Sequence, residues 1–133
     1  MFIDASLLIY LNTIKKSESR RVYEQFYEDL VLNHRAFTDT LVLDELLFIS
    51  KRKYGIPFEI TLKFVDSAVL DYAEVLPLGK EEYRKAAEII QKYAVYPSDA
   101  LHMAGMLLRN VPSIATEDAG FDKLKEIERV WVR

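Results

Sequence analysis

Hydrophobic and polar positions along the chain form two kinds of segment. Short apolar runs that end at a turn residue or a helix cap are typical of buried strands, whereas longer segments with apolar residues three or four positions apart are typical of helices. The stretch FIDASLLIYL, residues 2–11, contains both kinds, because a short apolar run reaches Asp4 and a long apolar segment follows it. An ionised carboxylate in such surroundings is costly unless it is paired or bound to a metal.

The two kinds of segment alternate along the whole sequence. Strands are expected at residues 2–4, 36–38, 73–78, 113–116 and 129–133. Helices are expected at residues 5–14, 17–33, 40–54, 57–71, 80–94, 97–109 and 119–127. Because strands separated by helices imply a parallel sheet covered on both faces, the prediction is a three-layer α/β/α sandwich with a central parallel sheet of four to five strands. A single domain over residues 1–133 is expected to form it.

Several helix ends carry recognisable signals. Ser17 or Ser19 is expected to cap the second helix, and Asp39 or Thr40 the third, because short polar side chains accept hydrogen bonds from the first free backbone N–H groups. Gly55 is expected to end the third helix, since glycine readily adopts the left-handed conformation that follows a last helical turn.

Composition narrows the class of protein. The sequence is 50% hydrophobic and 29% charged, a balance typical of globular domains, and it contains no cysteine, which excludes a thiolate metal site. No segment resembles a signal peptide, and the apolar runs are shorter than the roughly 20 residues that a membrane span needs, so we expect a cytoplasmic protein without a membrane partner. The net charge of −3 argues against a protein that coats nucleic acid through a basic surface, but not against a nuclease whose acidic site binds cations.

Acidic residues follow three of the predicted strands. Asp4 ends the first strand, Asp39 follows the second, and Asp118 follows the strand that ends at Thr116. In parallel sheets, ligands bind in the crevice beyond the carboxyl ends of the strands. Taken alone, Asp118 is better explained as a helix start, so the prediction of a site rests on the acids considered together.

Two further carboxylates belong to predicted helices. The residues three and four positions from Glu45 are all apolar: Leu41, Val42, Phe48 and Ile49. The side chain of Glu45 is therefore expected to lie along the buried stripe of its helix. Asp99, in PSDALHMA, lies in the first turn of its helix, where a favourable interaction with the helix dipole is a purely structural alternative.

The joint pattern predicts a cation site. Carboxylates that meet at one end of a parallel sheet repel one another and take up protons unless a cation lies between them. Oxygen ligands without cysteine or paired histidine suit Mg²⁺ or Mn²⁺ rather than Zn²⁺. Such sites usually perform phosphoryl chemistry, in which the phosphates of the substrate complete the coordination of the metal.

The same residues form a set of motifs. D-x-S follows the first strand, a glutamate lies in an apolar helix, S-D-A-L-H opens a later helix, and T-x-D-x-x-F-D lies near the C-terminus. In this order, and over essentially the whole chain, the set resembles the PIN domain. The resemblance is strongest to the single-domain VapC-type toxins and their prokaryotic relatives.

The resemblance implies a role for individual residues. The family's catalytic, metal-binding acids fall on Asp4, Glu45, Asp99 and Asp118. Ser6 and Thr116 fall on small polar positions whose hydroxyl groups would donate hydrogen bonds that hold the carboxylates in place. Asp122 matches a position that is acidic in only some members, so its role stays open.

The resemblance also implies a function. It predicts a Mg²⁺- or Mn²⁺-dependent endoribonuclease that hydrolyses RNA phosphodiester bonds, and a toxin inhibited by a cognate antitoxin protein. In the toxin branch it further implies a homodimer.

Two other functions compete with this one. A phosphatase with Asp4 as nucleophile would need a second aspartate two positions later, where this sequence has Ser6. A catalytically weak PIN-like module that binds RNA or protein would need no working metal site, and the full acidic set argues against it.

Other polar residues have simpler interpretations. His102, three residues after Asp99, is interpreted as a packing or structural residue rather than a general base, and His34 as a cation at a helix end. The basic clusters at residues 15–21 and 51–53 are either solvated helix ends or contacts to RNA phosphates.

Overall fold

One parallel sheet organises the computed structural model, which describes residues 1–132. Its strands are β1 (Phe2–Ile3), β2 (Ala36–Asp39), β3 (Ala73–Leu76), β4 (Ser113–Ala115) and β5 (Glu128–Val130). They lie in the order β3-β2-β1-β4-β5, and every neighbouring pair is parallel. The predicted α/β class with a central parallel sheet is confirmed, with five strands in the sheet.

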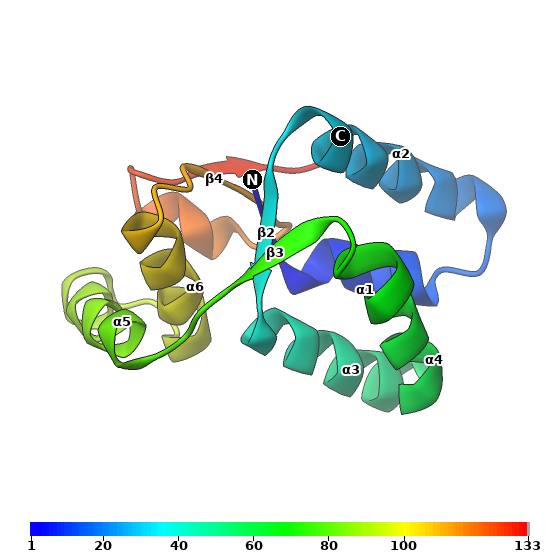
Figure 1. Ribbon diagram of the computed structural model, residues 1–133, viewed down its shortest axis with the longest axis horizontal. Helices are drawn as coiled ribbons and strands as arrows, with labels where there is room; N and C mark the ends of the chain where they lie inside the picture. The colour runs from blue at the N-terminus through cyan, green and yellow to red at the C-terminus, as the bar shows by residue number, and fades with distance from the viewer. Residues whose placement is uncertain (133) are drawn as a thin grey trace.

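Helices connect the strands and cover the sheet on both faces. They are α1 (Ala5–Thr13), α2 (Ser17–Asn33), α3 (Thr40–Tyr54), α4 (Phe58–Phe64), α5 (Lys80–Tyr93) and α6 (Pro97–Leu108), with a π-helical segment η1 (Val65–Val69) and a 3₁₀ helix η2 (Ala119–Lys123). Figure 1 shows α5 and α6 on one side of the strands and α1 to α4 on the other. The central strand β1 is consequently enclosed, and Phe2 and Ile3 are almost completely buried.

The strand order reverses at β1. The chain runs outward from β1 through β2 to β3, and later forms β4 and β5 on the other side of β1. Open parallel sheets bind ligands at such a reversal, outside the carboxyl ends of the strands. Asp4 directly follows β1 and Thr116 directly follows β4, so residues 112 positions apart meet at the same crevice.

Apolar side chains from both helical layers fill the core. The largest side chains that are completely or almost completely buried include Phe2, Leu7, Leu8, Leu46, Met103, Met106, Ile114 and Phe121. Burying an apolar side chain of this size contributes roughly 1.5–3 kcal/mol. A polar link complements this packing, because the side-chain amide of Asn12 on α1 donates to Ser50 Oγ on α3 at 2.9 Å and to Thr61 Oγ1 on α4 at 2.8 Å.

The predicted signals at the ends of α3 are confirmed, whereas the predicted cap of α2 is wrong. Asp39 caps α3 by accepting a hydrogen bond from Val42 N, and Gly55 follows the last turn in the left-handed conformation. In α2, neither serine is the cap. Lys16 occupies that position without a side-chain hydrogen bond, and its carbonyl accepts the first helical bond, from Arg20 N at 2.9 Å.

Several predicted elements end earlier than the sequence suggested. The segment predicted as one helix at 57–71 is α4 followed by η1, which ends at Val69. The third strand stops at Leu76 because Pro77 has no N–H to donate to a sheet. The last strand spans Glu128–Val130, and residue 133 lies outside the described residues.

The helix predicted at 119–127 is the short 3₁₀ helix η2. Asp118 accepts a hydrogen bond from Gly120 N, and Leu124 N donates to Phe121 O at 3.4 Å, which is three residues back. Phe121 and Leu124 are both buried, and a spacing of three residues aligns side chains on one face of a 3₁₀ helix. The short 3₁₀ helix therefore brings apolar side chains into the core with fewer residues than the predicted α-helix.

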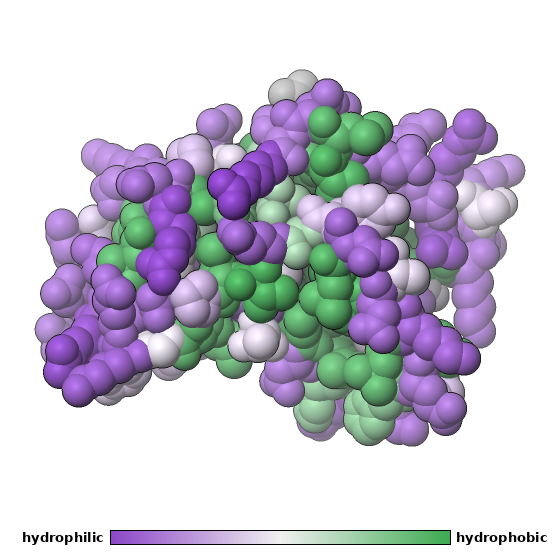
Figure 2. All heavy atoms as spheres, viewed as in Figure 1, coloured by the Kyte–Doolittle hydropathy of each residue, from purple (hydrophilic) through white to green (hydrophobic). Residues whose placement is uncertain are grey.

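Apolar side chains also reach the surface over α3 and α4. Phe48, Tyr54, Phe58, Ile60 and Leu62 are all more than two-fifths exposed. Figure 2 shows apolar surface over the lower part of the molecule, where these two helices lie in Figure 1. Between residues 1 and 132, none of the helices has both the length and the apolar character that a membrane crossing requires.

Two glycines give opposite predictions for the same substitution. Gly55 has φ of 69°, and alanine pays roughly 1–2 kcal/mol in that region. Gly105 lies inside α6, where an added Cβ would only meet Leu76 Cδ1 at 3.9 Å, an ordinary contact. Gly55→Ala should therefore lower the free energy of unfolding by roughly 1–2 kcal/mol. Gly105→Ala should leave it unchanged or raise it by up to about 1 kcal/mol.

Urea unfolding followed by circular dichroism measures both effects. A Gly55→Ala variant as stable as the wild type would contradict the left-handed assignment. A strongly destabilised Gly105→Ala variant would contradict the space that the structure leaves beside α6.

Candidate active site

An acidic cavity lies where the strand order reverses. Its volume is about 280 Å³, and the residues that line it are Asp4, Ser6, Ile9, Glu45, Asp99, Thr116, Glu117 and Asp118. The structure thus brings together all four acids that the sequence analysis selected. Five of the eight lining residues are acidic and, within residues 1–132, no basic side chain lines this cavity.

Asp4 is the most firmly held of these acids. It is buried at the end of β1, and its Oδ1 caps α1 by accepting a hydrogen bond from Ala5 N at 2.8 Å. Its Oδ2 accepts a hydrogen bond from Thr116 Oγ1 at 2.7 Å. A carboxylate has about four lone-pair positions, so both oxygens keep the capacity to bind a further group in the cavity.

Thr116 connects Asp4 to the loop that follows β4. Its hydroxyl group donates to Asp4 and accepts a hydrogen bond from Asp118 N at 3.1 Å, and the side chain is completely buried. Asp118 in turn accepts a hydrogen bond from Gly120 N through Oδ1 at 2.8 Å, so it also starts η2. The structural interpretation of Asp118 as a helix start is therefore correct, and the same residue lines the cavity.

Ser6 acts differently from the prediction. The resemblance implies that its hydroxyl group donates to a carboxylate, but Ser6 Oγ accepts a hydrogen bond from Glu117 N at 3.2 Å. The physical reason is the path of the chain, which carries the backbone of Glu117, rather than an acidic side chain, past the start of α1. Ser6 therefore holds the loop that carries Asp118, and it does not orient an acid directly.

Glu45 reaches the cavity from the second turn of α3, and Asp99 from the first turn of α6. Asp99 is part-buried, whereas Glu45 is exposed. The prediction that Glu45 lies along the buried stripe of its helix is wrong. The buried positions of α3 are Val42, Leu46 and Ser50, because its other flank borders the open cavity instead of the core.

Burial and neighbouring carboxylates raise the pKa values of Glu45 and Asp99. Burial, and then the charges of Asp118 and Asp4, raise the pKa of Asp99 from 3.8 to about 6. Burial, and then the charge of Asp4, raise the pKa of Glu45 above its ordinary value. Both acids therefore hold protons more tightly than isolated carboxyl groups do, because burial and neighbouring negative charges both disfavour the ionised form.

A buried histidine lies behind the acids. His102 Nδ1 is 2.6 Å from Asp39 Oδ2, and His102 Nε2 is 4.0 Å from Asp4 Oδ1. Burial alone would lower the pKa of His102, but the hydrogen bond and the charge of Asp39, with the charges of Asp4 and Asp99, raise it above its ordinary value. His102 does not line the cavity, in agreement with the prediction of a structural role.

Within the described residues, neither Asp122 nor the basic clusters line the cavity. Asp122 pairs with Arg129, with Nε to Oδ1 at 3.0 Å and Nη2 to Oδ2 at 3.2 Å. In the second basic cluster, Lys51 lies over the ring of Phe58 near the end of α3, whereas Glu45 lies near its start. None of the basic residues predicted to contact RNA phosphates lines the acidic cavity, within the described part of the chain.

Sequence reasoning missed two residues of this region. Glu117 lines the cavity and accepts a hydrogen bond from Tyr10 OH at 2.9 Å. The sequence signal that could have identified Glu117 was its position between Thr116 and Asp118. For Asp39, the sequence indicated a helix cap and an acid at the end of a strand, but not the pairing with His102, which is 63 positions away and connected to it by no local pattern.

The donor set of the cavity fits a divalent cation. No three Asp, Glu or His side chains in residues 1–132 are arranged so that they could hold a metal ion by themselves. Mg²⁺, however, is usually bound by one or two carboxylates together with water and substrate phosphates, and rarely by a closed protein cage. An open cavity lined by carboxylates with raised pKa values matches that mode of binding.

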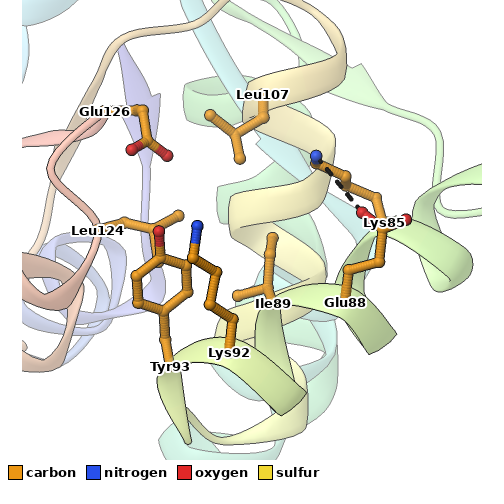
Figure 3. A pocket seen from close by; sticks show the side chains of 8 residues that line it. All are labelled: Lys85, Glu88, Ile89, Lys92, Tyr93, Leu107, Leu124 and Glu126. Carbon is orange, nitrogen blue, oxygen red and sulfur yellow. Dashed lines mark ion pairs between the residues drawn. The ribbon is translucent and has the colours of Figure 1, made fainter.

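A second cavity differs from the acidic one in its chemistry. Figure 3 shows it between α5, α6 and the segment after η2, and its volume is about 160 Å³. Its charged residues have both signs, and Lys85 pairs with Glu88 at 3.6 Å. Mixed charges and the apolar side chains Ile89, Leu107 and Leu124 give no reason to expect cation-assisted chemistry there.

Comparisons with known proteins agree with this geometry. The sequence matches the family model of the PIN domain over residues 1–127. Ribonuclease VapC2 of Methanocaldococcus jannaschii is 26% identical over 143 aligned positions, which cover 99% of this chain and 93% of that relative.

Solved structures share the fold at lower sequence identity. A chain of VapBC2 from Rickettsia felis, crystallised with a DNA fragment from its promoter, has a TM-score of 0.73 at 15% identity and aligns over 99% of this chain and 98% of that chain. VapC20 of Mycobacterium tuberculosis, described as a toxin that cleaves the sarcin–ricin loop, has a TM-score of 0.74 at 15% identity and aligns over 91% of this chain and 92% of that chain.

The raised pKa of Asp99 predicts how stability depends on pH. Because the folded-state pKa of about 6 lies above the ordinary value of 3.8, the folded chain binds this proton more tightly than the unfolded chain does. The contribution of Asp99 to stability is therefore present at low pH and is lost as the pH rises through this window. In EDTA at pH 7, Asp99→Asn should melt no lower than the wild type, and its melting temperature should fall less between pH 4 and pH 7.

Differential scanning calorimetry across this pH range measures the effect. Asp122→Asn is the matched control, because it removes one carboxylate outside the cavity and should leave the pH dependence unchanged. A large loss of stability in Asp99→Asn at pH 7 would show instead that Asp99 mainly stabilises the start of α6.

Proposed function

The chain belongs to the PIN domain family, and on that premise we propose that it is a metal-dependent endoribonuclease, the toxin of a toxin–antitoxin pair. The observation that carries this proposal is the convergence of Asp4, Glu45, Asp99 and Asp118 on one cavity at the carboxyl ends of β1 and β4. The name of the relative Ribonuclease VapC2 supports the ribonuclease activity, and that of VapC20 supports RNA as the substrate class.

Asp4 and Asp99 are the proposed direct ligands of Mg²⁺ or Mn²⁺, and Glu45 and Asp118 bind it directly or through water. A bound divalent cation would lower the pKa of a coordinated water and offset the negative charge of the scissile phosphate. Without cations, the acidic lining of the cavity would repel RNA. The charge of the site and the identity of its oxygen donors both support the proposed dependence on a divalent cation.

The surrounding residues hold this arrangement. Thr116 fixes one oxygen of Asp4 and the backbone of Asp118 at the same time, and Ser6 fixes the backbone of Glu117. Pre-organised ligands lower the reorganisation needed when metal and substrate bind. Hydrolysis with a water nucleophile at phosphorus and departure of the 3′-oxygen would leave 5′-phosphate and 3′-hydroxyl ends.

The proposed partners are RNA, an antitoxin protein and a second copy of the chain, in the cytoplasm. Three of the structural neighbours come from a toxin–antitoxin complex of Klebsiella pneumoniae, VapBC2 of Rickettsia felis and FitAcB of Neisseria gonorrhoeae. The exposed apolar side chains of α3 and α4 offer surface for protein contacts. Contiguous apolar surface of this kind often marks a protein interface.

A cleavage assay tests the ribonuclease proposal. The wild type should cleave a fluorophore-quenched single-stranded RNA in Mn²⁺ or Mg²⁺ and not in EDTA. Asp4→Asn should lower the rate by roughly 100-fold or more, since groups around a metal site typically contribute factors of this size. Asp122→Asn, which changes a carboxylate outside the cavity, should cleave at nearly the wild-type rate.

Equal rates for the wild type and Asp4→Asn, or undiminished cleavage in EDTA, would contradict the proposed chemistry. RNA binding by the folded wild type without any cleavage would instead favour a catalytically weak PIN-like module.

A further inference from the structure

We infer that Asp39 and His102 are positioning residues, which fix the spacing of the acids in the cavity without lining it. This inference rests on the proposed function, because it concerns the same carboxylates. The argument depends on the contacts that the two side chains make with each other, with α3 and with Asp4.

Asp39 connects two helices through one carboxylate. Its Oδ1 accepts a hydrogen bond from Val42 N at 3.0 Å and so caps α3, the helix that carries Glu45 in its next turn. Its Oδ2 accepts a hydrogen bond from His102 Nδ1 at 2.6 Å, on the helix that carries Asp99. Asp39 is 1% exposed, so no solvent competes for either bond.

His102 extends this link to Asp4. Its ring is 3% exposed, packs against Phe2 at a centroid distance of 5.4 Å, and places Nε2 4.0 Å from Asp4 Oδ1. Since Asp99 lies one helical turn before His102, a rotation of α6 that moved the imidazole would also move Asp99. The pair therefore connects α3 and α6 with the end of β1, and these are the elements that position Glu45, Asp99 and Asp4.

Stability alone gives a weaker explanation of the pair. Capping of α3 needs only one oxygen of Asp39, and an asparagine or serine would cap equally well. Burying two ionisable side chains costs desolvation energy that well-packed apolar residues avoid. Partners of metal-binding groups, by contrast, are commonly held in this way and affect metal affinity and activity through orientation.

Asp39→Asn separates the capping of α3 from the hydrogen bond to His102. An asparagine oxygen can still accept the hydrogen bond from Val42 N, whereas the amide nitrogen would face His102 Nδ1, which then loses its acceptor. His102→Gln is the second variant, because its shorter reach toward Asp39 loses the same hydrogen bond while an amide still points toward Asp4.

Glu82→Gln is the matched control. Glu82 is also a buried carboxylate at a helix start, where it accepts a hydrogen bond from Gly79 N at 2.6 Å. It also pairs with Arg109 Nη2, at the end of α6, at 3.4 Å. It does not line the acidic cavity. The same loss of charge at Glu82 should therefore change stability without changing the site.

Three measurements test the inference: calorimetric titration with Mn²⁺, steady-state RNA cleavage, and crystal structures of the metal-free proteins. Asp39→Asn and His102→Gln should bind Mn²⁺ roughly 10–100-fold more weakly and lose kcat by a similar factor, with KM for RNA little changed. Glu82→Gln should keep the wild-type affinity and kcat. Folded Asp39→Asn and His102→Gln variants with wild-type Mn²⁺ affinity and kcat would overturn the inference.

The metal-free structures keep this test independent of the proposed activity. A wild type that neither binds Mn²⁺ nor cleaves RNA would refute the proposed function. In that case, altered positions of Asp4, Glu45 or Asp99 in crystals of Asp39→Asn would still support the positioning role, and unchanged positions would overturn it.

Discussion

Repulsion between carboxylates at the reversal of the strand order is the constraint on which this structure depends. Four segments, at the end of β1, in α3, at the start of α6 and after β4, deliver acidic side chains to one cavity, and no basic side chain in the described residues shares its lining. Burial, and then the charges of the neighbouring carboxylates, raise the pKa values of Glu45 and Asp99. Hydrogen bonds around the cavity hold Asp4, Glu117 and Asp118 in place against this repulsion.

Those hydrogen bonds come from side chains that are more deeply buried than the acids they hold. Thr116 and Asp39 are completely or almost completely buried, whereas Glu45 and Asp118 are exposed. Thr116 joins the ends of β1 and β4, and Asp39 joins the start of α3 to α6. The hydrogen-bonded side chains Thr116 and Asp39 therefore lie beneath the cavity, and the exposed acids Glu45 and Asp118 face the space that a substrate would occupy.

Much of the fold followed from local signals. The alternation of apolar runs and amphipathic segments predicted the parallel sheet, and Asp39 and Gly55 marked the ends of α3 correctly. The predicted cap of α2 and the predicted length of the helix at η2 were wrong. The start of α2 is determined by a backbone hydrogen bond, and the extent of η2 by the burial of Phe121, rather than by helix propensity. Asp4, Asp99 and Asp118 could be chosen because each follows a strand or opens a helix, whereas Glu45 was chosen for its apolar neighbours at helical spacing although its side chain is exposed. The link between Asp39 and His102 could not, because only the tertiary structure brings them together.

The central claim is the proposal that the acidic cavity binds a divalent cation through Asp4 and Asp99, with Glu45 and Asp118 binding it directly or through water. Anomalous diffraction at the manganese edge, from crystals soaked in Mn²⁺, tests it most directly. The account predicts a peak inside the acidic cavity with carboxylate oxygens of Asp4 and Asp99 at coordination distances, about 2.1 Å as for Mg²⁺. An empty cavity at saturating Mn²⁺, or a peak bound only by residues elsewhere, would contradict it.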